Sequence, residues 1–90
     1  MTAVSWAPLL DGDPDSRIEW RDLELPGFWA LIQPRKPDAA NRNSYEYLIF
    51  RTRSGALAHR GTALNKDHAR RQVRGWERHC LDHPEAAPRP

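Results

Sequence analysis

Cysteine is nearly absent from this sequence of 90 residues, which contains only Cys80. One cysteine cannot form a disulfide within the chain, so no cross-link supplements the small core that a chain of this length buries. The five glycines are scattered and form no phosphate-binding loop. No apolar run approaches the roughly 20 residues of a membrane span, and the N-terminus has no signal-peptide pattern. We therefore expect a cytoplasmic protein that does not enter a membrane.

The sequence also lacks a well-spaced catalytic or metal-binding motif. Residues 79–83, HCLDH, place two histidines four positions apart, but structural zinc takes four ligands. Residues 11–22 begin like a calcium loop, but Ser16 stands where that loop needs glycine. His59 is a lone histidine, and one small core leaves little room for a deep pocket. We expect a protein that is not an enzyme and that carries no metal and no cofactor.

Aromatic residues and arginine are what the sequence does contain. Its four tryptophans, two tyrosines and two phenylalanines favour an ordered domain, because each ring buries on the order of 150 to 250 Å². All of the 14 basic residues except Lys36 and Lys66 are arginine, whose planar fork suits phosphate and carboxylate. Residues 1–45 carry a net charge of −2 and residues 46–90 a net charge of +4. An arginine-rich composition also follows from a GC-rich genome, so charge alone identifies no ligand.

The chain predicts one small α+β domain, residues 17–83, between an irregular N-terminal arm, residues 1–16, and a flexible tail, residues 84–90. Prolines and the DGDPD run oppose regular structure in the arm. Within the domain, apolar segments separated by turn signals predict an antiparallel meander of three or four strands. These strands are expected at residues 17–25, 28–32, 45–53 and 56–63, the first being the least regular.

A helix is expected after the meander. The Asn65 side chain can accept hydrogen bonds from the first helical turn, and Pro84 ends the helix. Gly75 costs about 1 kcal/mol in its middle, a cost that a close approach of helix to sheet would explain. Apolar residues at helical spacing form a stripe that predicts packing across one sheet face: Ala69, Val73, Trp76 and Cys80.

The hairpin between residues 45 and 63 decides which face the helix covers. A two-residue turn at Ser54-Gly55 pairs Leu48 with Gly61, and pleat alternation then divides the side chains. The face expected beneath the helix, where Gly61 leaves room for a bulky ring such as that of Trp76, holds Leu48, Phe50, Thr52, Leu57, His59 and Gly61. The face expected to be open holds Tyr45, Tyr47, Ile49, Arg51, Arg53, Ala56, Ala58 and Arg60.

This second face and the long loop that follows residue 32 form the candidate binding surface. Arginines can neutralise phosphates, and a sheet can enter a DNA groove. The layout resembles small sheet-plus-helix DNA-binding domains such as the arm-binding domain of phage integrases, in topology alone. We expect a non-catalytic binding module with DNA or RNA as its leading partner. The residues expected to bind are Tyr45, Tyr47, Arg51, Arg53 and Arg60 on the sheet, with Arg35, Lys36 and Arg42 in the loop.

Several alternatives stay open. Aromatic residues and arginine are also enriched at protein interfaces, so the module could bind a protein, act as a small inhibitor, or form a homodimer with Tyr47 and Ile49 between two sheets. The N-terminal arm, through Trp6, Leu9 and Leu10, could instead cover the second face. Arginine and tyrosine are also ordinary on a solvated antiparallel sheet. A solvated surface is likewise expected for the basic helix flank of Lys66, Arg70, Arg74 and Arg78.

Overall fold

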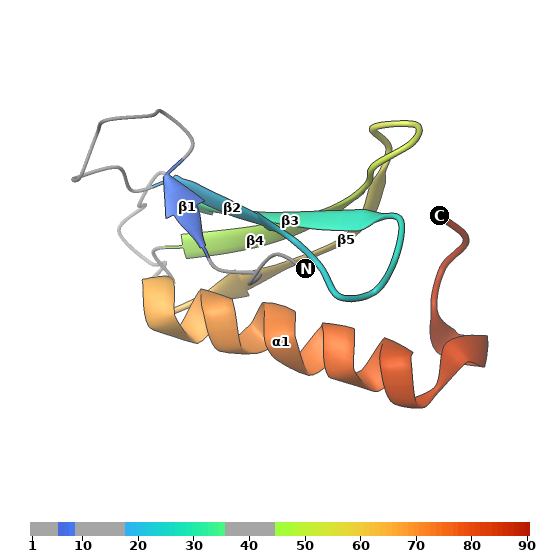
Figure 1. The fold of residues 1–90 in the computed structure, drawn as a ribbon. Coiled ribbons are helices and arrows are strands. Elements are labelled where there is room, and N and C mark those ends of the chain that lie inside the picture. Colours follow the sequence, from blue (N-terminus) through green and yellow to red (C-terminus); the bar gives the residue numbers. More distant parts are fainter. Residues whose placement is uncertain (1–5, 9–17, 36–44) are drawn as a thin grey trace.

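Helix α1 (Lys66–Asp82) lies along one face of an antiparallel sheet whose five strands follow one another in sequence order (Figure 1). The structure is a computed structural model that describes residues 6–8, 18–35 and 45–90. The predicted α+β class with one C-terminal helix across the sheet is confirmed, but the sheet has five strands rather than three or four. The strands are β1 (Ala7–Pro8), β2 (Glu19–Asp22), β3 (Phe28–Pro34), β4 (Tyr45–Arg51) and β5 (Leu57–Ala63), and a short 3-10 helix, η1 (Pro84–Ala86), follows α1.

The additional strand, β1, comes from the segment predicted as an irregular arm. Ala7 and Pro8 pair with Trp20 and Glu19 at the edge of the sheet. Proline has no N–H to donate, so an edge strand is where a sheet tolerates it. Leu9 and Leu10, which were also expected in the arm, lie outside the described residues.

The start of α1 follows from its local sequence. The Asn65 side chain accepts a hydrogen bond from the backbone N–H of His68 at 2.8 Å, and His68 Nδ1 accepts one from the backbone N–H of Leu64 at 3.0 Å. The arrangement is similar to a capping box, because Asn65 satisfies a free donor of the first turn and His68 reaches back to the backbone of the residue before the cap. The predicted cap at Asn65 is confirmed.

The core lies between α1 and the sheet. On the helix, Ala69, Val73 and Cys80 are buried and Trp76 is partly buried, as the predicted stripe requires. In β3 and β4, buried and partly exposed residues alternate, so one set faces the helix and the other set faces away. The buried strand residues beneath α1 are Phe28, Ala30 and Ile32 of β3, Tyr47 and Ile49 of β4, and Ala63 of β5.

The predicted register of the β4–β5 hairpin is wrong by one residue. Gly61 pairs with Tyr47 rather than Leu48, because the turn is longer than predicted. The backbone N–H of Arg51 donates to the carbonyl of Ala56 at 2.9 Å, so the loop spans residues 52–55 instead of the predicted pair 54–55. The longer loop alone shifts the pairing by two residues. The irregularity between Ile49 and Phe50 reverses one of them, so a net shift of one residue remains.

This shift exchanges the two faces of β4. Tyr47 and Ile49, expected on an open surface, lie beneath α1, with 8% and 0% of their surface exposed. Leu48 and Phe50, expected beneath the helix, face away from it.

On β5, His59 and Gly61 do face the helix as predicted. The His59 ring stacks on Trp76 with the centroids 5.6 Å apart. Gly61 leaves room for a bulky ring, but the ring is that of Tyr47. A Cβ atom at Gly61 would overlap the Tyr47 ring at its hydroxyl oxygen and Cζ.

An ion pair that the sequence did not predict joins β2 to the helix. Glu77 is 4% exposed and accepts hydrogen bonds from the Arg21 side chain and from the backbone N–H of Glu24. The Arg21 guanidinium also lies 5.6 Å from the centre of the Trp6 ring, a cation–π distance. Removing either charge would leave the other buried and unpaired, so this contact couples the edge of the sheet to α1.

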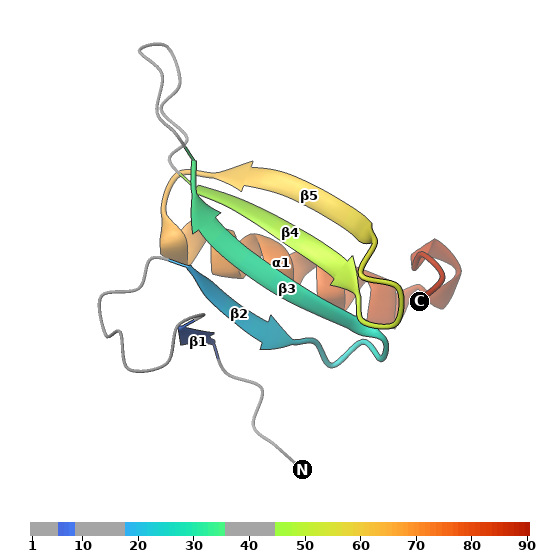
Figure 2. The same cartoon turned by 90° about the horizontal axis from the view of Figure 1, so that it is seen from above.

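Two other features differ from expectation. Gly75 is exposed, and a Cβ added there would meet nothing within 4 Å, so the predicted close approach to the sheet at Gly75 is wrong. In the segment predicted as a flexible tail, the carbonyl of Arg89 accepts a hydrogen bond from Arg51 Nε at 2.8 Å. Figure 2 shows the C-terminus beside the β4–β5 loop. In the described ranges, no helix has the length and apolar character needed to cross a bilayer.

The pairing of Tyr47 with Gly61 predicts a coupled effect on stability. Gly61→Ala should destabilise the fold by roughly 1 to 3 kcal/mol, because the new methyl group must displace the Tyr47 ring. In a Tyr47→Leu background the same change should cost much less, since the ring is gone. Denaturant unfolding of the four proteins measures the coupling, and equal costs in both backgrounds would contradict this register.

The position of His59 predicts a pH dependence. Burial lowers the pKa of His59 from its ordinary value of 6.5, so the folded protein binds this proton less tightly than the unfolded chain does. The resulting stability is fully present above pH 6.5 and is lost as pH falls toward the lower, folded pKa. His59→Phe should therefore reduce the fall in Tm on acidification. His79→Gln, at an exposed histidine, is the control; an unchanged pH profile in His59→Phe would refute this assignment.

Candidate functional site

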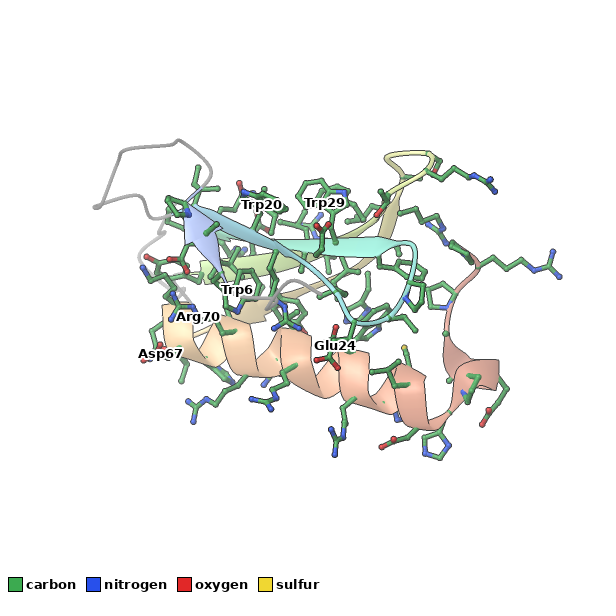
Figure 3. The ribbon with its side chains drawn as sticks, in the orientation of Figure 1. Trp6, Trp20, Glu24, Trp29, Asp67 and Arg70 are labelled. Atoms are coloured by element: carbon green, nitrogen blue, oxygen red, sulfur yellow. The ribbon has the colours of Figure 1, made fainter. Side chains whose placement is uncertain are left out.

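The sheet face turned away from α1 carries mostly apolar side chains. Figure 3 shows Trp20 and Trp29 on the side of the sheet opposite the helix. Alternation along the strands and the strand register place four further apolar residues on the same side. We call this surface the open face, and its apolar residues are Trp20, Trp29, Leu31, Leu48, Phe50 and Leu57.

These six residues form two adjacent rows across the sheet. In one row, Trp20 pairs with Leu31, and Leu31 with Leu48. In the next row, Trp29 pairs with Phe50, and their rings stack at 4.7 Å with an interplanar angle of 24°. Leu57 pairs with Phe50 and extends that row. The apolar residues are therefore neighbours and form one continuous patch.

A polar row borders the patch. Gln33 Nε2 donates a hydrogen bond to Glu46 Oε1 at 2.6 Å, and Arg60 forms an ion pair with Glu46 at 3.1 Å. Asp22 pairs with Trp29 at the other end of the open face. The charged residues that the register places on this face are thus Asp22, Glu46 and Arg60, and the arginine is already paired with a carboxylate.

No helix or strand of the described part of the chain packs on the open face. Helix α1 contacts β3, β4 and β5 from the opposite side, and Figure 2 shows the sheet in front of the helix with no other element over it. The apolar residues of the open face are partly exposed, and Leu57 is exposed at 42%. A continuous apolar patch of this kind is typical of an interaction surface.

The predicted sheet surface of tyrosines and arginines does not form. Tyr47 is buried and Tyr45 packs against the core, both on the helix side. Arg51 donates hydrogen bonds to the carbonyls of Leu57 and Arg89, each at 2.8 Å. Arg53 is exposed in the β4–β5 turn, and Arg60 alone lies on the open face. These five residues were expected together, and the register separates them.

The loop residues of the predicted site are only partly described. Arg35 follows β3 and is partly buried. Lys36 and Arg42 lie outside the described residues, so their predicted role stays a prediction.

The residues considered for metal binding do not assemble into a ligand set within the described ranges. His79 and His83 are neighbours, with ring centroids 5.0 Å apart, but no group of three or more potential ligands occurs there. Cys80 is buried, and burial raises the pKa of its thiol, which disfavours the thiolate that binds metal. The acidic residues 11, 13 and 15 of the calcium-like segment lie outside the described residues.

The sequence did contain a signal for the open face. Residues 28–32, FWALI, and 45–50, YEYLIF, are apolar on both strand parities, a pattern that is typical of strands covered on both faces. The predicted register of the β4–β5 hairpin assigned the wrong set of β4 side chains to the helix side. Trp20 and Trp29 were not considered as site residues.

Comparison of the chain with family models, curated proteins and solved structures found no match. Its function therefore has to be argued from its own residues.

Proposed function

We propose that this protein is a non-catalytic interaction module that binds a second copy of itself through the open face. The observation that carries the proposal is the continuous apolar patch around Trp29, Phe50 and Leu48, which lies opposite the face covered by α1. Burying such a patch against another apolar surface is favourable by about 25 cal/mol for each Å² removed from water.

The charges on this face favour a protein partner over nucleic acid. Affinity for nucleic acid comes largely from phosphate contacts, whereas the open face offers Arg60, which is already paired with Glu46, and a further carboxylate at Asp22. Tryptophan and phenylalanine surrounded by a polar border are what protein interfaces contain. Protein interaction, one of the alternatives considered from the sequence, thus gains support with a different set of residues.

A second copy is the partner because the face complements itself. A two-fold axis that runs parallel to the strands, between β3 and β4, brings Leu31 of one copy over Leu48 of the other and Trp29 over Phe50. The same operation brings Trp20 over Arg60, an arrangement suited to a cation–π contact. Aligned packing of two sheets over a shared core is a common architecture, and a two-fold interface uses the same patch on both subunits.

The size of the face suggests a dimer that dissociates on dilution. β3, β4 and β5 are seven residues long and β2 is four, so with strands about 4.8 Å apart and about 3.3 Å per residue the face measures at most roughly 19 by 23 Å in projection. A standard interface buries about 800 Å² of accessible surface on each partner, so this face is at the small end of that class.

The mass of the protein as a function of concentration tests the proposal. Sedimentation equilibrium of the full chain should give a mass that rises from monomer to dimer between micromolar and submillimolar concentration. Leu48→Lys places a charge at the centre of the open face and should keep the protein monomeric, because the lysine cannot be buried there without a partner.

The matched control is Leu81→Lys, at a leucine on α1 that is 38% exposed and lies outside the open face. This variant should dimerise like the unmodified protein. A wild-type protein that is monomeric throughout the range, or a dimer that persists in Leu48→Lys, as pairing through the β5 edge would allow, contradicts the proposal. Far-UV circular dichroism establishes that both variants are folded.

A further inference from the structure

The outer surface of α1, on the other side of the molecule, has a different character from the open face. Arg71, Arg74 and Arg78 surround Gly75 there, and the four residues line a shallow depression of about 440 Å³. All four are exposed. We call these residues the arginine patch.

Glu24 and Glu77 line a neighbouring depression with Arg74 and Arg78, but no carboxylate of the described residues lies closer than 4.0 Å to the arginine patch. Arg71 and Arg74 have no carboxylate within 4.0 Å in the described part of the chain, and Arg78 reaches Asp82 only at 4.0 Å. An exposed pair at that distance contributes little. The predicted basic flank is therefore divided, because Lys66 and Arg70 both pair with Glu19 of β2 while Arg74 and Arg78 remain available to a ligand.

Gly75 is the second observation that points to a ligand. Glycine in the middle of a helix is unfavourable, and no packing contact requires it, because a Cβ atom there would meet nothing within 4 Å. Glycine is also the residue that lets a ligand approach a backbone closely. Gly75 lies at the centre of three arginines, where it would let a ligand bound by them approach the helix backbone.

We propose that the arginine patch binds the phosphate backbone of nucleic acid, with Gly75 allowing that backbone to lie close to the helix. Arg71 and Arg78 are seven residues apart, so about 10.5 Å of helix axis separates them, and duplex nucleic acid places one phosphate per strand about every 3.4 Å. The patch thus spans about three phosphate steps, so its three arginines can contact three of the phosphates along one stretch of a strand. Arginine suits this task because its fork donates two hydrogen bonds to one phosphate.

The patch favours nucleic acid over a membrane surface. An interfacial helix needs an apolar side to enter the lipid, whereas every exposed residue of α1 before Leu81 is polar, charged or glycine. This proposal does not depend on the open face, because the two surfaces lie on opposite layers of the molecule (Figures 1 and 3).

Binding to a short duplex DNA of mixed sequence, followed by fluorescence anisotropy, tests the proposal. With three phosphate contacts, affinity should fall about 40-fold between about 50 and about 200 mM salt. Arg71→Ala, Arg74→Ala and Arg78→Ala should each weaken binding and lower the slope against log salt by about 1. Arg89→Ala removes the same charge from an exposed residue near the C-terminus and should leave binding unchanged.

Gly75→Ala and Gly75→Gln separate the role of the glycine from that of charge. Both should stabilise α1, and Gly75→Ala should raise Tm by about 4 to 8 °C. Both should nevertheless bind the duplex more weakly, Gln more than Ala, because a side chain now holds the phosphates away from the helix. A protein that becomes more stable while binding less well is the expected signature.

Three results would overturn the proposal. The first is the absence of salt-dependent duplex binding by the unmodified protein. The second is an effect of Arg89→Ala equal to those of the patch variants, which would indicate general electrostatic attraction. The third is stronger association with vesicles containing phosphatidylserine than with the duplex. None of these results bears on dimerisation, which the mass measurements follow separately.

Discussion

The register between β4 and β5 is the constraint on which the rest of this structure depends. With Tyr47 opposite Gly61, the tyrosine ring lies across the glycine and beneath α1. Because strand side chains alternate, that single choice turns Ile49 into the core and Leu48 and Phe50 out of it. The composition of both faces of β4 follows from one cross-strand pair, and so does the position of the apolar patch.

The molecule that results has two chemically distinct sides. The open face combines stacked aromatic rings with charges that are largely paired among themselves. The outer surface of α1 combines arginines with a glycine that costs helix stability, roughly 1 kcal/mol relative to alanine. A dimer formed through the open faces would carry one arginine patch on each outer side, and it could hold two nucleic-acid segments at once. The two proposals are thus compatible, although neither needs the other.

Much of the fold could be predicted from the sequence, because its signals are local. The Asn65 cap, the stripe of Ala69, Val73, Trp76 and Cys80, and the strands around FWALI and YEYLIF follow from helical spacing, capping chemistry and apolar runs. Register depends on the length of the turn and on a bulge, and the residues around Ser54 and Gly55 fit a two-residue and a four-residue loop alike. The predicted placement of the β4 side chains was wrong for this reason, because a register error of one residue moves every side chain to the other face. The buried pair of Arg21 and Glu77 could not be foreseen either, since a charge at the edge of a helical stripe normally indicates solvent.

Nuclear Overhauser contacts between side chains test the central claim most directly. The account predicts contacts from the Trp76 ring to His59 and Phe28, between the Tyr47 ring and Gly61, and between Trp29 and Phe50 on the opposite side of the sheet. Contacts from Trp76 to Leu48 or Phe50 would contradict it, because they would place the proposed open face beneath the helix.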